Sequence, residues 1–99
     1  MQTLSFQFSA GHPAQGRVLV GCVGSGDLEV MLEPGTSGRL AIAVVTSVNG
    51  GEQRWQQLFQ RMFSDQQMPA LNITIHDFGA TPGVVRLRME QALEELSHV

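Results

Sequence analysis

Residues 39–63, RLAIAVVTSVNGGEQRWQQLFQRMF, contain the change of hydrophobic period from which the fold class follows. Between residues 39 and 47 the apolar side chains alternate in the two-residue period of a half-buried strand. Residues 49–51, Asn-Gly-Gly, then break the strand. After the break the apolar residues recur at i, i+3, i+4, i+7 and i+8, which places on one helix face Trp55, Leu58, Phe59, Met62 and Phe63. This segment therefore predicts a strand followed by an amphipathic helix.

The chain before residue 39 predicts three further strands. The first carries alternating apolar residues at Leu4, Phe6 and Phe8, and the other two are the Val- and Leu-rich segments 17–23 and 27–32. Between the last two lies Gly24-Ser25-Gly26, and glycine adopts the positive φ of tight turns at little cost. We therefore predict a β-hairpin with Ser25 at its apex. Residues 33–38, EPGTSG, predict a second turn.

The chain after the first helix predicts one more strand and one more helix. Residues 71–76 alternate as a strand, and residues 77–80 are interpreted as the turn that follows it. Thr81 is suited to cap a helix with Pro82 in its first turn, and we expect this helix to run to about Ser97. The order ββββαβα predicts an α+β two-layer sandwich over residues 1–99, with a mostly antiparallel sheet of about five strands and two helices on one face.

Length and composition exclude several classes of protein. The chain has 99 residues, enough for one small domain, and 42% of them are hydrophobic, which argues against a disordered chain. A domain of this size buries a limited fraction of its surface, so a deep enclosed active site is not expected. The size disfavours a self-contained enzyme and leaves a surface site or a partner interface.

The charge balance excludes further classes. Six arginines stand against nine acidic residues, for a net charge of −3, and they form no basic stripe of the kind that binds nucleic acid. No apolar run reaches the length of a membrane span, and the N-terminus lacks the features of a signal peptide. Cys22 is the single cysteine, so no internal disulfide forms. These features predict a cytoplasmic domain.

The residues that most often bind metals do not occur at metal-binding spacings. His12, His76 and His98 lie far apart, and Cys22 has no cysteine neighbour at the spacing of a zinc site. We therefore expect no metal site. His76 and Asp77 are adjacent on a predicted strand, where neighbouring side chains point to opposite faces, so we do not expect them to form a catalytic pair.

The two arginines of the last predicted helix, Arg86 and Arg88, are candidates for contact with an acidic partner. We interpret both more simply as residues of a solvated helix face.

The segment Gly24-Ser25-Gly26-Asp27 is a candidate site of covalent modification. The flanking glycines remove bulk around the Ser25 hydroxyl, and a hairpin tip is accessible to a modifying enzyme. Asp27 supplies a carboxylate, a candidate to orient that hydroxyl or a metal-bound donor on the incoming enzyme. The segment lacks the following helix of a phosphate-binding glycine loop, and a purely structural hairpin fits the same residues.

Three segments together resemble the acyl carrier protein, or delta subunit, of malonate decarboxylase. They are residues 21–30 (GCVGSGDLEV), 44–50 (VVTSVNG) and 75–85 (IHDFGATPGVV). Their order and the chain length agree with that family, so the resemblance covers essentially the whole chain. At positions 22 and 31, Cys22 and Met31 replace the aliphatic residues that are usual in the family. Both are substitutions of the kind found in a protein core.

The resemblance implies a covalent carrier without catalytic residues of its own. Ser25 would carry 2′-(5″-phosphoribosyl)-3′-dephospho-coenzyme A through a phosphodiester bond, with Gly24, Gly26 and Asp27 as the supporting turn. The arm would hold acetyl and malonyl thioesters. The implied partners are an acyltransferase subunit, two decarboxylase subunits and a prosthetic-group transferase.

Three alternatives stay open at this point. The carrier subunit of a citrate lyase-type complex would use the same prosthetic group. An unmodified scaffold or binding module would carry no adduct and would present an exposed apolar patch. A small hydrolase using Ser25 and His76 would turn over substrate in isolation.

Overall fold

The computed structural model describes residues 1–21, 24, 26–47, 49–64 and 67–98. The elements in this part of the chain follow one another in the predicted order ββββαβα. Their bounds are β1 Gln2–Ser9, β2 Val18–Gly21, β3 Leu28–Pro34, β4 Arg39–Thr46, α1 Glu52–Phe63, β5 Leu71–Asp77 and α2 Pro82–Leu96.

The five strands form a single open sheet in the order β1-β4-β5-β3-β2. Three of the four strand pairs are antiparallel, and the central pair β4–β5 is parallel. A parallel pair needs a crossover connection, and α1 provides it between β4 and β5. The predicted mostly antiparallel sheet is therefore confirmed.

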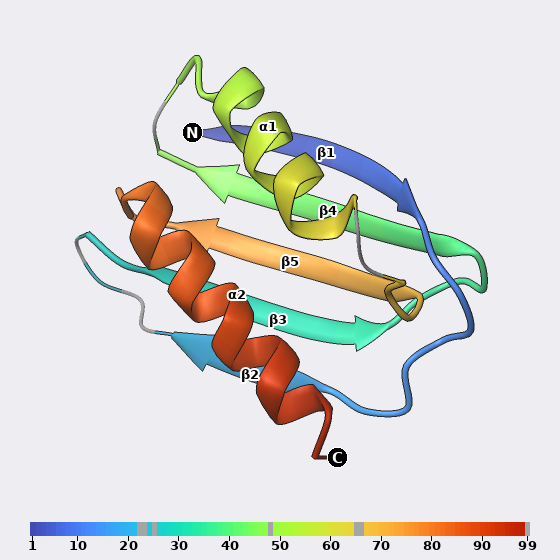
Figure 1. Ribbon diagram of the computed structural model, residues 1–99. Coiled ribbons are helices and arrows are strands. Elements are labelled where there is room, and N and C mark those ends of the chain that lie inside the picture. The colour runs from blue at the N-terminus through green and yellow to red at the C-terminus, as the bar shows by residue number, and fades with distance from the viewer. Residues whose placement is uncertain (22–23, 25, 48, 65–66, 99) are drawn as a thin grey trace.

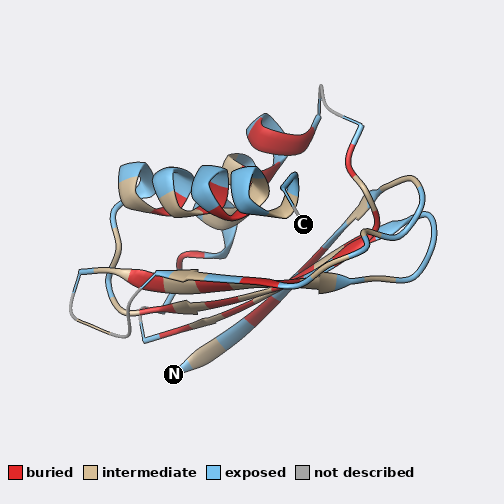
Figure 2. Ribbon diagram, turned by 90° about the horizontal axis from the view of Figure 1, so that it is seen from below, coloured by how far each residue is buried: buried red, intermediate tan, exposed pale blue. Residues whose placement is uncertain are grey.

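Both helices lie on the same face of the twisted sheet, as Figure 2 shows. In Figure 1, α1 lies over β1 and β4, whereas α2 lies over the half of the sheet that contains β3 and β2. The predicted two-layer arrangement is confirmed. The opposite face of the sheet is covered by neither helix.

The core fills the space between the helices and the sheet. In β4 and β5, and in β3 from Leu28 to Leu32, every second residue is buried, as the period of two predicts. The stripe of α1 adds an aromatic cluster, in which the Phe59 ring lies 5.3 Å from that of Phe6 and 6.1 Å from that of Phe63. From α2 the buried residues are Val85, Met89 and Ala92.

The turn predicted at residues 33–38 begins later than expected. Glu33 and Pro34 belong to β3, and Pro34 pairs with Leu71 of β5. Proline is tolerated here because β2 pairs with β3 only as far as Leu32, so Pro34 has no strand on that side.

Both helices begin where the sequence predicts. Helix α1 starts directly after Gly51, and Thr81 caps α2 by accepting a hydrogen bond from the Val84 amide at 3.3 Å, with Pro82 in the first turn. Neither helix in the described residues is long and apolar enough to cross a membrane. In Figure 1 both helices begin at the end of the sheet where β5 ends and β3 starts.

Candidate functional site

The candidate site is the connection between β2 and β3, the predicted hairpin. The two strands pair antiparallel from Val18–Leu32 to Gly21–Glu29, which confirms the hairpin. Ser25, the predicted apex, lies outside the described residues, as do Cys22 and Val23.

The described residues of the hairpin tip, Gly24, Gly26 and Asp27, form a turn with open surroundings. The Asp27 amide donates a hydrogen bond to the Gly24 carbonyl at 3.2 Å. Gly26 is exposed and has φ of 78°, a conformation that only glycine adopts easily. A Cβ added to Gly24 or Gly26 would meet no atom within 4 Å. Among the described residues, the space directly beside both chain neighbours of Ser25 is therefore open.

Backbone hydrogen bonds fasten this tip to the turn between β5 and α2. The Gly26 amide donates to the Phe78 carbonyl at 2.8 Å, and the Phe78 amide donates to the Asp27 carbonyl at 2.9 Å. Two reciprocal backbone bonds hold two segments in a fixed relative position. The tip is thus anchored by residues about 50 positions later in the chain.

The Asp27 side chain adds a third connection, to helix α2. Its carboxylate accepts two hydrogen bonds from Arg88, from Nη2 at 2.7 Å and from Nε at 3.1 Å. It also accepts the Leu28 amide at 2.7 Å. These hydrogen bonds hold the pKa of Asp27 below its ordinary value of 3.8. The bonds from Arg88 have the largest effect, and the bond from the Leu28 amide has the second largest. A two-point contact between a guanidinium and a carboxylate fixes direction as well as distance.

The interpretation of Arg88 as a solvated residue is wrong. The side chain is about three-quarters buried and contacts Asp27 across 61 positions of sequence. Arg86 does lie on a solvated face, where it pairs with Glu90 one turn away at 3.2 Å. The two arginines differ because only Arg88 lies on the side of α2 that faces the β2–β3 connection.

His76 and Asp77 point to opposite faces of the sheet, as predicted. His76 lies on the face without helices, with its Nδ1 3.4 Å from a carboxylate oxygen of Glu29. Asp77 is buried on the other face, where it accepts hydrogen bonds from the Thr46 hydroxyl at 2.8 Å and from the amides of Gly79 and Ala80. Asp77 therefore shapes the turn that supports the tip and does not orient His76.

The family model of the malonate decarboxylase delta subunit (MdcD) matches residues 15–96 of this chain. The chain belongs to the malonate decarboxylase delta subunit family. The match includes the β2–β3 connection and both segments that anchor it.

Curated proteins of this delta subunit family match the chain from end to end. The malonate decarboxylase acyl carrier protein of Stutzerimonas stutzeri is 76% identical over 99% of both chains. The protein of the same name from Azotobacter vinelandii is 71% identical over 100% of both chains.

A solved structure shares the fold. It is a chain of the crystal structure of a Pseudomonas malonate decarboxylase hetero-tetramer in complex with malonate. The TM-score is 0.95 and the identity is 69%, with 97% of this chain and 99% of that chain covered.

The sequence did not reveal two residues that hold the tip, Phe78 and Arg88. Phe78 acts through its backbone, which carries no residue-type signal. Arg88 had one usable signal, since residues 85, 89 and 92 define the buried face of the helix and Arg88 lies next to it. Among the described residues, no group of three His, Cys, Asp or Glu side chains is arranged to hold a metal ion.

Proposed function

We propose that this chain is the acyl carrier subunit of malonate decarboxylase, with 2′-(5″-phosphoribosyl)-3′-dephospho-coenzyme A attached to Ser25. The observation that carries the proposal is the end-to-end similarity to proteins named as that carrier. The geometry of the hairpin adds support, because the residues on both sides of Ser25 are unobstructed.

The prosthetic group would supply a thiol on a long arm, on which acetyl and malonyl groups are carried as thioesters. The chain's own residues would keep Ser25 accessible and hold its surroundings in place. Gly24 and Gly26 keep side chains away from the Ser25 hydroxyl, so the transferase can approach it closely. The Asp27–Arg88 pair and the bonds to Phe78 keep the base of the tip in one position.

The partners we propose are an acyltransferase subunit, two decarboxylase subunits and a prosthetic-group transferase. The similar chain of the Pseudomonas hetero-tetramer supports an assembly with other subunits. A tethered arm keeps its thioester at a high local concentration in each active site that it reaches. One small protein can thus serve two reactions in turn.

The test is mass spectrometry of the intact chain after co-expression with the malonate decarboxylase subunits and the transferase. Cleavage after Arg17 and Arg39 gives a peptide, residues 18–39, that contains Ser25. We expect the mass of the prosthetic group on Ser25. The peptide also contains Ser37, so Ser37→Ala is a matched control that keeps the adduct, whereas Ser25→Ala loses it.

The same experiment separates the alternatives. An unmodified chain in a preparation with active decarboxylase would overturn the carrier proposal and favour a scaffold. Turnover by the isolated chain that disappears in Ser25→Ala would favour the hydrolase. Loading by the transferase of a citrate lyase complex, in place of the malonate decarboxylase transferase, would favour the citrate lyase-type carrier.

A further inference from the structure

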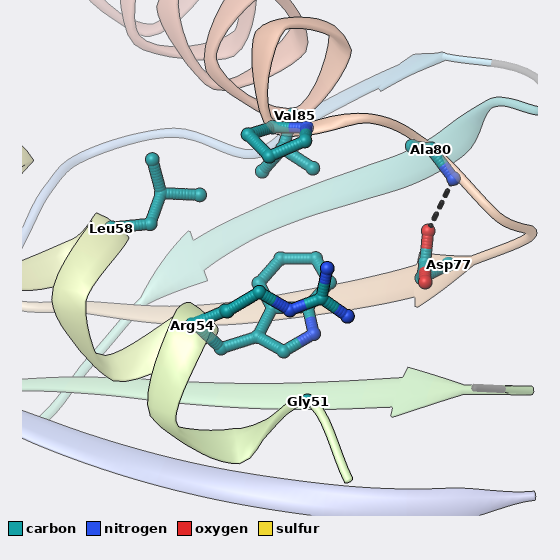
Figure 3. Close-up of a pocket in the computed structure, with 8 residues that line it drawn as sticks. Gly51, Arg54, Leu58, Asp77, Ala80 and Val85 are labelled. Carbon is teal, nitrogen blue, oxygen red and sulfur yellow. Dashed lines mark hydrogen bonds between the residues drawn. The ribbon is translucent and has the colours of Figure 1, made fainter. Parts of the chain in front are cut away.

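A small pocket lies between the start of α1 and the turn that joins β5 to α2 (Figure 3). Its volume is about 80 Å³. Trp55 and Leu58 line it from α1, and Val85 lines it from α2. These side chains give the pocket an apolar wall that includes one aromatic ring.

Two charged residues also line the pocket, and they differ in what they can still bind. Both oxygens of Asp77 already accept hydrogen bonds, one from Thr46 and the other from the turn amides. Arg54 is exposed, and its side chain makes no ion pair or hydrogen bond with any residue in the described part of the chain. The pocket therefore combines an aromatic surface with a cation that is available to an anionic ligand.

The pocket and the base of the attachment tip share the turn after β5. Asp77 and Ala80 line the pocket, and Phe78 between them bonds to Gly26 and Asp27. In Figure 1 the start of α1, the end of β5 and the start of β3 all lie at one end of the sheet. Gly26, the chain neighbour of Ser25, is therefore bonded directly to the turn that lines this pocket.

We infer that the pocket binds the adenine nucleotide part of the covalent prosthetic group, with the adenine against Trp55 and the diphosphate at Arg54. The inference rests on the proposed attachment to Ser25. Indole rings bind bases by stacking, and a guanidinium recognises phosphate oxygens.

The covalent order of the group favours the nucleotide over the acyl end as the occupant. The phosphoribosyl link joins Ser25 to the adenosine part, so the nucleotide is the nearest large portion of the arm. The thioester lies at the far end and must remain free to reach the partner active sites. Because the nucleotide is tethered, its effective concentration at the pocket is on the order of mM, which suffices to populate a weak site.

Trp55 reports on this site because it is the only tryptophan of the chain. We would compare the full chain in its unmodified and loaded forms, each verified by mass. The measurements are the NMR shift of the indole N–H and the tryptophan fluorescence. On loading, we expect a shift of the indole resonance and a loss of emission through stacking of the adenine.

The variant Arg54→Gln tests the role of the cation. We expect it to restore most of the emission and the indole shift of the unmodified form, whereas Arg54→Lys retains part of the effect. Arg61→Gln is the matched control, because Arg61 lies on the same helix and is exposed but does not line the pocket. It should behave as the unsubstituted chain. Circular dichroism of each variant verifies the fold.

The outcomes separate this inference from the proposed function. A chain that carries the adduct on Ser25 but shows an unchanged Trp55 signal would overturn the pocket and leave the carrier role intact. Equal effects of Arg54→Gln and Arg61→Gln would also overturn it, since they indicate general charge attraction. A chain without the adduct beside an active decarboxylase would remove both proposals.

Discussion

Asp27 links three parts of the molecule through its side chain and its backbone. It contacts Arg88 of α2, the first residue of β3, and the turn after β5. The residue types suggested a role for Asp27 in orienting the Ser25 hydroxyl or a group on an incoming enzyme. Both of its carboxylate oxygens accept bonds from Arg88, so Asp27 also supports the tip through these contacts.

Replacing Arg88 by methionine tests this support. The change keeps the length of the side chain and removes both hydrogen bonds to Asp27. We expect faster hydrogen exchange of the Gly26 and Phe78 amides and slower loading of Ser25, with the fold retained. Arg86→Met is the control, because Arg86 pairs only with Glu90 on the surface. Equal exchange and loading rates in the two variants would contradict a supporting role.

The lowered pKa of Asp27 predicts how this support responds to acid. A carboxyl group whose pKa is lower in the folded than in the unfolded chain stabilises the fold above its unfolded pKa. This stabilisation is lost as the pH falls through the folded pKa, which lies below 3.8. We therefore expect the contribution to be complete at neutral pH and to disappear only in stronger acid. An NMR titration of Asp27 measures the pKa, and a value at or above 3.8 would contradict the prediction.

At the level of elements, the buried bond between Thr46 and Asp77 connects the ends of the parallel strands β4 and β5. Thr46→Val keeps the shape of the side chain but leaves one oxygen of the buried carboxylate without this donor. We expect the free energy of unfolding to fall by about 1–3 kcal/mol. Thr74→Val, on the helix-free face of β5, is the control and should change stability little. Urea unfolding of both variants provides the measurement, and equal midpoints would refute the prediction.

The end of β2 depends on glycine at position 21. Gly21 has φ of 100°, and an added Cβ would lie 2.1 Å from the Leu28 carbonyl oxygen. Gly21→Ala therefore combines backbone strain with a clash against β3. Gly50→Ala is a matched comparison, because Gly50 also has positive φ but has open space around it. We expect Gly50→Ala to cost about 1–2 kcal/mol and Gly21→Ala clearly more, as measured by thermal unfolding. Similar losses would contradict this.

The type and order of the elements were predictable because their signals are local. The alternation of Leu71, Ile73 and Ile75, the stripe of α1 and the Thr81 cap each depend on residues a few positions apart. The exact end of β3 was not predictable, because Pro34 is tolerated in the strand only beyond the point where β2 stops pairing with β3. That condition depends on a neighbouring strand and not on the residues beside Pro34.

At the scale of the whole molecule, the strand order β1-β4-β5-β3-β2 could not be predicted from the sequence. The placement of β5 between β4 and β3 depends on how the two helices share one face, which no short motif specifies. The contact of Asp27 with Arg88 follows from the same arrangement. The candidate attachment residue was found from a motif and a resemblance, whereas the residues that anchor its hairpin required the tertiary structure.

The anchoring of the tip by later segments also has a consequence during synthesis. The hairpin strands are synthesised first, and Phe78 and Arg88 follow 51 and 61 positions after Asp27. A chain that stops before residue 78 retains the pairing of β2 with β3 but lacks the bonds from Phe78 and Arg88 that fasten the tip. A transferase that recognises the anchored tip would therefore act only after Arg88 has been synthesised and has reached Asp27.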